Sequence, residues 1–139
     1  RTDDATIEQV RSFAYEIGLA FQIKDDILDL TRDDATLGKP AGNDLRQGTV
    51  TLPTLYFAQQ MDPVGDDAAL LERVITAEEL DDADLDALIG RIRASGAIEA
   101  ATAEADRIHQ RALDRLIAVP GEEHRQMLAA WADLALTAI

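Results

Sequence analysis

Apolar residues recur at three- and four-residue spacing along most of the chain, and no stretch keeps the alternation of a β-strand. The first such pattern follows Asp3, Asp4 and Thr6, whose side-chain oxygens can cap a helix, and predicts one helix from there to Leu30. Later patterns predict a short helix that starts at Thr51 and Pro53 and stops near Asp62-Pro63, then helices over about 66–75, 82–94, 98–119 and 122–139. Gly96 and Pro120-Gly121 are the expected breaks. The residues expected to pack inward are Tyr56, Phe57, Leu85, Leu88, Ile89, Ile92, Met127, Leu128, Trp131, Leu134 and Leu136. The chain is therefore predicted to be all-α, a helical bundle.

The first predicted helix carries a polar stripe that an ordinary surface helix does not explain. Gln22, Asp25, Asp26 and Asp29 have the spacing i, i+3, i+4, i+7 and share one face. Apolar residues border that face on both sides: Ile17, Phe21 and Leu28 on one, and Leu19, Ile23, Ile27 and Leu30 on the other. Because both flanks favour burial, the carboxylates are expected to look into a cleft lined by other helices, partly desolvated.

Acids placed so close together need a neutralising charge. Two carboxylates about 5 Å apart repel by roughly 3 kcal/mol at an effective dielectric of ~20. Arg32 can help Asp29, but Asp25 and Asp26 have no cation three or four residues away on the helix, and Lys24 points elsewhere. Hard oxygen ligands suit Mg²⁺, which takes one or two carboxylates and completes its shell with water and phosphate oxygens. The alternative is a surface helix whose acids only aid solubility.

The stretch that follows, residues 31–48, favours the metal hypothesis. It is long for a connection without apolar periodicity, and such loops are usually lids or binding loops. Lys39 lies between Gly38 and Pro40, where the backbone can approach a ligand and the ammonium suits phosphate oxygens. Acids and a lysine loop together predict a metal-bridged phosphate.

These residues carry a family resemblance. The stretches are residues 18–29 (GLAFQIKDDILD), 38–40 (GKP), 42–45 (GNDL) and 48–53 (GTVTLP). Together they resemble the second aspartate-rich region of the trans-polyprenyl diphosphate synthases. The resemblance is specific over residues 18–53 and loose elsewhere. It implies an all-α isoprenoid synthase fold, with Mg²⁺ held between two aspartate-rich motifs on facing helices, and condensation of an allylic prenyl diphosphate with isopentenyl diphosphate.

The resemblance also implies that this chain is incomplete. Only the second motif is present, and the first motif and the basic residues that bind isopentenyl diphosphate would lie upstream of Arg1. Residues 1–139 are thus expected to be the C-terminal portion of a single domain, inactive alone. The full-length enzyme is expected to be a cytoplasmic homodimer.

Roles for individual residues follow from the same resemblance. Asp25, with Asp26 and Asp29 directly or through water, would hold Mg²⁺, and Lys39 would contact the diphosphate oxygens. Gln22 and Phe21 would line the reacting centre, with a packing role equally open for Phe21, and Asp44 would anchor Lys39 or the loop. One departure is Thr49, where many members have a lysine. A residue other than lysine at this position resembles some long-chain synthases more than the short-chain ones, and it favours a long product.

Composition limits the possible partners. The chain has 139 residues, of which 13 are basic and 27 acidic, and its formal net charge is −14. Such a charge repels nucleic acid and anionic membranes. The chain has no cysteine, which excludes disulfides and thiol nucleophiles and fits a cytosolic protein. The longest apolar run, residues 128–139, is too short to span a bilayer, and no signal peptide is visible.

Two hypotheses of another class remain open. One is a non-catalytic helical subunit of a heteromeric prenyl synthase, although it would have to retain Asp25, Asp26, Asp29 and Lys39 without using them. The other is an acidic helical interaction module. His109 and His124 lie fifteen residues apart on different predicted helices, so no two-histidine metal site within a helix is expected.

Overall fold

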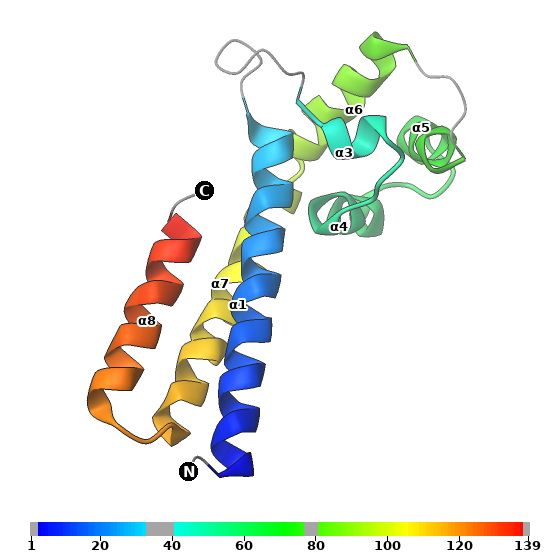
Figure 1. The fold of residues 1–139 in the computed structure, drawn as a ribbon. Coiled ribbons are helices and arrows are strands. Elements are labelled where there is room, and N and C mark those ends of the chain that lie inside the picture. The colour runs from blue at the N-terminus through cyan, green and yellow to red at the C-terminus, as the bar shows by residue number, and fades with distance from the viewer. Residues whose placement is uncertain (1–2, 33–40, 77–80, 138–139) are drawn as a thin grey trace. The chain divides into compact units, whose positions relative to one another are not determined.

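The computed structural model describes residues 3–32, 41–76 and 81–137. Its helices, in chain order, are α1 (Asp4–Thr31), α3 (Asn43–Arg46), α4 (Leu52–Gln60), α5 (Asp66–Ile75), α6 (Asp82–Ala94), α7 (Ala97–Arg115), the 3₁₀ turn η1 (Leu116–Ala118) and α8 (Glu122–Thr137) (Figure 1). The described residues include no strand. The all-α prediction is confirmed, and the predicted helices from 66–75 and 82–94 have the predicted bounds.

Helix ends follow from capping chemistry. The Asp3 carboxylate accepts a hydrogen bond from the backbone N–H of Thr6 at 2.7 Å, so the first turn of α1 is capped as expected. Asp81 does the same for α6, accepting from the N–H of Asp84 at 2.7 Å. Gly96, with φ 82°, separates α6 from α7 because its left-handed backbone conformation ends the first helix.

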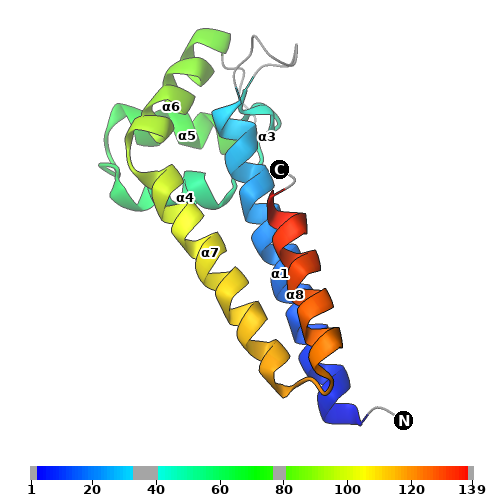
Figure 2. The same cartoon turned by 90° about the vertical axis from the view of Figure 1, so that its left-hand side faces the viewer.

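The chain divides into two compact units. The first comprises residues 1–24 and 103–139, in which the N-terminal part of α1 lies beside the later part of α7 and beside α8 (Figure 2). Its core consists of Phe13, Ile17, Ala112, Leu116, Val119 and Ala132. Glu16 is buried in this unit, and its carboxylate accepts hydrogen bonds from Arg111 and Arg115 of α7.

The second unit comprises residues 25–102, with helices α3 to α6. Its core consists of Leu30, Leu45, Phe57, Leu71, Val74, Leu85, Leu88, Ile89, Ile92 and Ala97. The four residues of α6 predicted to face inward are therefore buried. Phe57 is buried as predicted, and Tyr56 is half-buried against the same core.

Three expectations differ from the structure. The loop predicted between residues 31 and 48 contains the one-turn helix α3 at its end. The helix predicted over 98–119 becomes a 3₁₀ turn at Leu116, ahead of Pro120. On α8, three of the residues predicted to pack inward are exposed: Met127 at 62%, Trp131 at 52% and Leu134 at 67%. Leu136 is buried and Leu128 half-buried, as predicted. Within the described residues, no helix combines the length and apolar character needed to cross a membrane.

Candidate functional site

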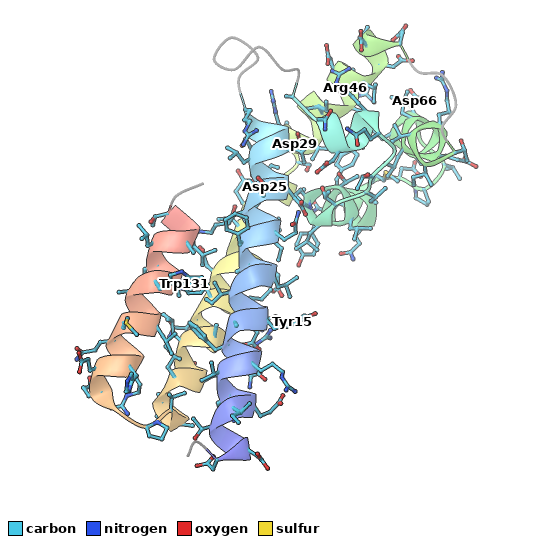
Figure 3. The ribbon with its side chains drawn as sticks, viewed as in Figure 1. Tyr15, Asp25, Asp29, Arg46, Asp66 and Trp131 are labelled. Carbon is cyan, nitrogen blue, oxygen red and sulfur yellow. The ribbon has the colours of Figure 1, made fainter. Side chains whose placement is uncertain are left out.

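The polar stripe lies on one continuous helix, as predicted. Asp25 is exposed, and Asp26 and Asp29 are half-buried. All three belong to the last two turns of α1, where Figure 3 shows Asp25 and Asp29. Gln22 lies one turn earlier and is exposed. The structure thus keeps these four residues together on one helix, but the expectation that Asp25 is desolvated is wrong for this chain.

The apolar borders of the stripe are only partly buried. Ile17, Ile23 and Leu30 are buried, and Ile27 and Leu28 are half-buried. Leu19 is 38% and Phe21 42% exposed, so the prediction that both flanks are buried is wrong at these two positions. The reason is that periodicity identifies which side chains can be buried, whereas burial itself requires a neighbouring element to cover them.

Asp29 is engaged by the backbone of α3. Its Oδ1 accepts a hydrogen bond from the N–H of Asn43 at 3.2 Å, and its Oδ2 accepts one from the N–H of Asp44 at 3.0 Å. The Asp29 carbonyl also accepts from the N–H of Gly42 at 2.9 Å. A carboxylate at the N–H end of a helical turn is favoured electrostatically. Asp29 therefore caps α3 from fourteen residues away and holds that end of the loop on α1.

Asp44 shares the electrostatic field of the stripe. It is half-buried, and burial raises its pKa above the ordinary aspartate value. The negative charges of Asp29, Asp26 and Asp25 raise the pKa of Asp44 further. Three carboxylates of α1 thus repel the carboxylate of Asp44, and a bound cation would relieve this repulsion.

The carboxylates of the stripe fit Mg²⁺ if water and substrate phosphates supply its other ligands. Among the residues that the structure describes, no group of three His, Cys, Asp or Glu side chains is arranged to hold a metal by itself. Mg²⁺ does not require such a cage, because it commonly binds through one or two carboxylates and takes its other ligands from water and substrate phosphates. Exposed Asp25 and half-buried Asp26 fit that mode, so the metal role of Asp25, Asp26 and Asp29 stays a prediction.

Cations near the stripe make other contacts. Lys24 lies 3.5 Å from Asp106, which agrees with the expectation that it points away from the stripe. Arg32 was expected to help Asp29, and in the structure its carbonyl accepts from Nη2 of Arg93 at 3.1 Å. Arg93 also donates through Nε to the carbonyl of Leu30. A guanidinium at the C-terminal carbonyls of α1 stabilises the helix end that presents Asp29.

Arg46 is a residue that sequence reasoning missed. Its side chain is only 16% exposed, and its three nitrogen atoms all donate hydrogen bonds. Nε donates to the carbonyl of Ala41 at 3.2 Å, Nη1 to Asp82 at 2.6 Å, and Nη2 to Asp86. The acidic side chains at the start of α6 are thus partly an anchor for α3. No local sequence signal could reveal these contacts, since Asp82 and Asp86 lie 36 and 40 residues after Arg46.

Other predicted site residues give a mixed result. Lys39, the expected diphosphate contact, lies outside the described residues. Asp44 was expected to anchor Lys39 or the loop, and in the structure its N–H binds Asp29 and its carbonyl accepts from the N–H of Thr49 at 2.8 Å. Thr49 itself is exposed.

Known proteins resemble this chain over nearly all its length. The model of the polyprenyl synthetase family matches residues 1–92. Component 2 of heptaprenyl diphosphate synthase from Geobacillus stearothermophilus is 39% identical over 130 residues, which are 94% of this chain and 38% of that protein. An all-trans-nonaprenyl-diphosphate synthase (geranyl-diphosphate specific) from Rhodobacter capsulatus is 38% identical, over 95% of this chain and 39% of its own length.

Solved structures give the same result. Geranylgeranyl pyrophosphate synthase from Bacteroides thetaiotaomicron superposes with a TM-score of 0.85 at 28% identity, covering 99% of this chain and 44% of that one. A polyprenyl synthase from Caulobacter crescentus, complexed with calcium and isoprenyl diphosphate, has a TM-score of 0.78 at 35% identity, with 97% and 40% covered. The chain therefore has the fold of part of these synthases and spans about two fifths of their length.

Proposed function

Because the chain belongs to the polyprenyl synthetase family, we propose that it is the part of a trans-prenyltransferase that carries the second aspartate-rich motif. The whole protein would condense an allylic prenyl diphosphate with isopentenyl diphosphate to give a longer trans-polyprenyl diphosphate. The observation that carries this proposal is the set of Asp25, Asp26 and Asp29 on the last turns of α1, with Asp29 fastened to α3.

The chemistry follows from the charges at the site. Asp25 and Asp26, with Asp29 directly or through water, would hold Mg²⁺ against the diphosphate, and Lys39 would contact the diphosphate oxygens. Bound Mg²⁺ supplies positive charge that stabilises the departing diphosphate. The allylic C–O bond breaks and leaves a carbocation, and the isopentenyl double bond forms the new C–C bond to it. Loss of a proton restores the double bond. Gln22 and Phe21, both exposed on α1, are the proposed lining of the reacting centre.

Activity of the longest polypeptide that the gene encodes tests the proposal. With farnesyl diphosphate, labelled isopentenyl diphosphate and Mg²⁺, we expect a discrete polyprenyl product, whose chain length chromatography would give. Asp25→Asn should lower kcat/KM by about 10² to 10⁴, since it removes a ligand of the ion that stabilises the transition state. Asp66→Asn is the matched control, because Asp66 is an exposed aspartate at the start of α5 and should keep full turnover.

A contrary result has a specific meaning. Folded Asp25→Asn protein with unchanged turnover would rule out the metal role. A folded, full-length wild-type protein that incorporates no isopentenyl unit with any allylic primer would favour the non-catalytic subunit. That alternative has one supporting observation, because a relative is named as component 2 of a heptaprenyl diphosphate synthase. The homodimer, the cytoplasmic location and the long product stay predictions.

A further inference from the structure

Arg46 connects two helices through contacts that leave little freedom to its side chain. Its planar guanidinium reaches back to the Ala41 carbonyl within its own segment and across to Asp82 and Asp86 of α6. Charge-assisted bonds in a fixed fork geometry specify orientation as well as distance, which a lysine cannot reproduce. With its side chain 16% exposed, Arg46 is shielded more than Asp82, at 90%, or Asp86, at 63%.

The helix that Arg46 holds is too short to be stable alone. α3 has four residues, and a single turn gains too few hydrogen bonds to offset the cost of nucleation. Its position is therefore set by what it contacts. Leu45 is buried in the core of the second unit, Arg46 binds α6, and the N–H groups of Asn43 and Asp44 bind Asp29. Gly42, packed against Ile89 of α6, leads into the turn.

The turn of α3 also holds the Asp29 carboxylate through hydrogen bonds. Two backbone N–H groups bind one oxygen each, so the side chain has a fixed direction despite its acidic neighbours. If α3 shifted on α6, both donors would leave Asp29 together. The carboxylate would then turn freely, one helical turn from Asp25.

We propose that Arg46 is a positioning residue for the aspartate-rich motif: it fixes α3 on α6, so that the N–H groups of Asn43 and Asp44 hold the Asp29 carboxylate. This inference rests on the proposed function only for its consequence in catalysis. Groups that orient metal ligands from outside typically change metal affinity by about 10- to 100-fold when they are removed. Held in this direction, the Asp29 carboxylate would meet a bound ion directly or through water, beside Asp25 and Asp26.

Amide hydrogen exchange tests the structural step without any metal or substrate. In the longest polypeptide of the gene, Arg46→Met should speed exchange at the N–H groups of Asn43 and Asp44 by about tenfold, because their acceptor is lost whenever α3 opens. The control is Arg91→Met, which removes the ion pair between Arg91 of α6 and Asp67 of α5. It should leave exchange at Asn43 and Asp44 unchanged.

A second variant tests the connection from the other side. Replacing both Asp82 and Asp86 by alanine removes the acceptors on α6 while α3 keeps its own sequence, so it should reproduce the faster exchange. The double variant also tests the link between α3 and α6 if the Arg46→Met protein loses its helical circular dichroism and so fails to fold. Exchange at Asn43 and Asp44 in Arg46→Lys should be faster than in wild type and slower than in Arg46→Met, since lysine keeps the positive charge but not the planar guanidinium. Unchanged exchange in the double variant would overturn the proposal.

The catalytic consequence has its own measurement. Arg46→Met should raise the Mg²⁺ concentration for half-maximal turnover by about tenfold, with kcat at saturating Mg²⁺ and KM for isopentenyl diphosphate nearly unchanged. A general loss of structure would instead lower kcat at all Mg²⁺ concentrations. Equal Mg²⁺ dependence of Arg46→Met and wild type would overturn the positioning role. An inactive wild type with the expected exchange pattern would instead contradict the proposed function, while the structural link would hold.

Discussion

Gly42 has a backbone conformation that is strained for residues with a Cβ, and the space beside it is too small for one. Its φ is 71°, and a Cβ built there would lie 2.3 Å from Cδ1 of Ile89. Its N–H also donates to the Asp29 carbonyl. The glycine is therefore required by the close approach of the α3 segment to α6.

Gly42→Ala is expected to lower the free energy of unfolding by about 3 kcal/mol, from the left-handed backbone and the overlap with Ile89 together. Denaturant titration followed by circular dichroism measures the change. Gly90→Ala is the matched control, because Gly90 lies in the exposed middle of α6 with no atom within 4 Å of an added Cβ. It should raise the stability by about 0.5 to 1 kcal/mol through helix propensity. A Gly42→Ala protein as stable as wild type would contradict the packing described for this turn.

At the scale of helices, the buried Glu16 fastens α1 to α7 within the first unit. Its carboxylate accepts from Nε of Arg111 at 2.8 Å and from Nε and Nη2 of Arg115 at 2.8 and 2.7 Å. The hydrogen bonds from Arg115 lower the pKa of Glu16 most, and the hydrogen bond and positive charge of Arg111 lower it further. Together they hold this pKa below the ordinary glutamate value of 4.5, although burial raises it. The ionised form is thus the one that folding stabilises.

Glu16→Gln should reduce the free energy of unfolding by about 2 kcal/mol at pH 7, since two guanidinium groups lose a charged acceptor. A carboxyl group with a lowered folded-state pKa contributes fully above pH 4.5 and loses its contribution as the pH falls through the folded-state value. The difference between wild type and variant should therefore be constant from pH 6 to 8 and shrink below about pH 4.5. Urea titrations at pH 7, 5 and 3.5 measure it.

The control for this prediction is Glu104→Gln. Glu104 pairs with Arg107 three residues along the same helix, and an i,i+3 pair at the surface is worth at most about 0.5 kcal/mol. Equal losses in both variants, or a Glu16→Gln loss that grows in acid, would contradict the role of Glu16 as the fastening between helices.

The elements could be predicted from sequence wherever their signals are local. Asp3 caps α1, Gly96 ends α6, and the apolar spacing over 85–92 matches the buried residues. α3 was missed because its start is capped by Asp29, fourteen residues earlier, and its end is held by α6. The stripe on α1 was found because its residues share one helix. Exposure of Leu19 and Phe21 was not predicted, because no sequence pattern shows which neighbours cover a face.

At the scale of the whole chain, charge is the dominant long-range term. With 27 acidic and 13 basic residues, even complete pairing leaves 14 carboxylates without an opposite charge. Such an excess destabilises the compact state through self-repulsion. The four clustered carboxyl groups of Asp25, Asp26, Asp29 and Asp44 are a local instance of it.

Sodium chloride should therefore raise the melting temperature. The rise should be steep up to about 0.15 M salt and flatten beyond, because the screening length is then already about 8 Å. Differential scanning calorimetry at pH 7 measures it, and an equal osmolarity of sucrose controls for preferential exclusion, whose effect grows steadily with concentration. A melting temperature that falls with salt would mean that the ion pairs, such as those of Arg46 and Glu16, outweigh the repulsion.

The exposed apolar groove of the first unit gives the protein a built-in optical probe. The groove is lined by Val10, Phe13, Ala14, Met127, Leu128 and Trp131, and the Trp131 ring lies 6.4 Å from that of Phe13. Trp131 is the sole tryptophan of the chain and is 52% exposed. Its fluorescence thus originates at one place, where α8 meets α1. An apolar molecule that covers the groove would shift the Trp131 emission to shorter wavelength. Binding at this surface can therefore be followed by intrinsic fluorescence, without an added label.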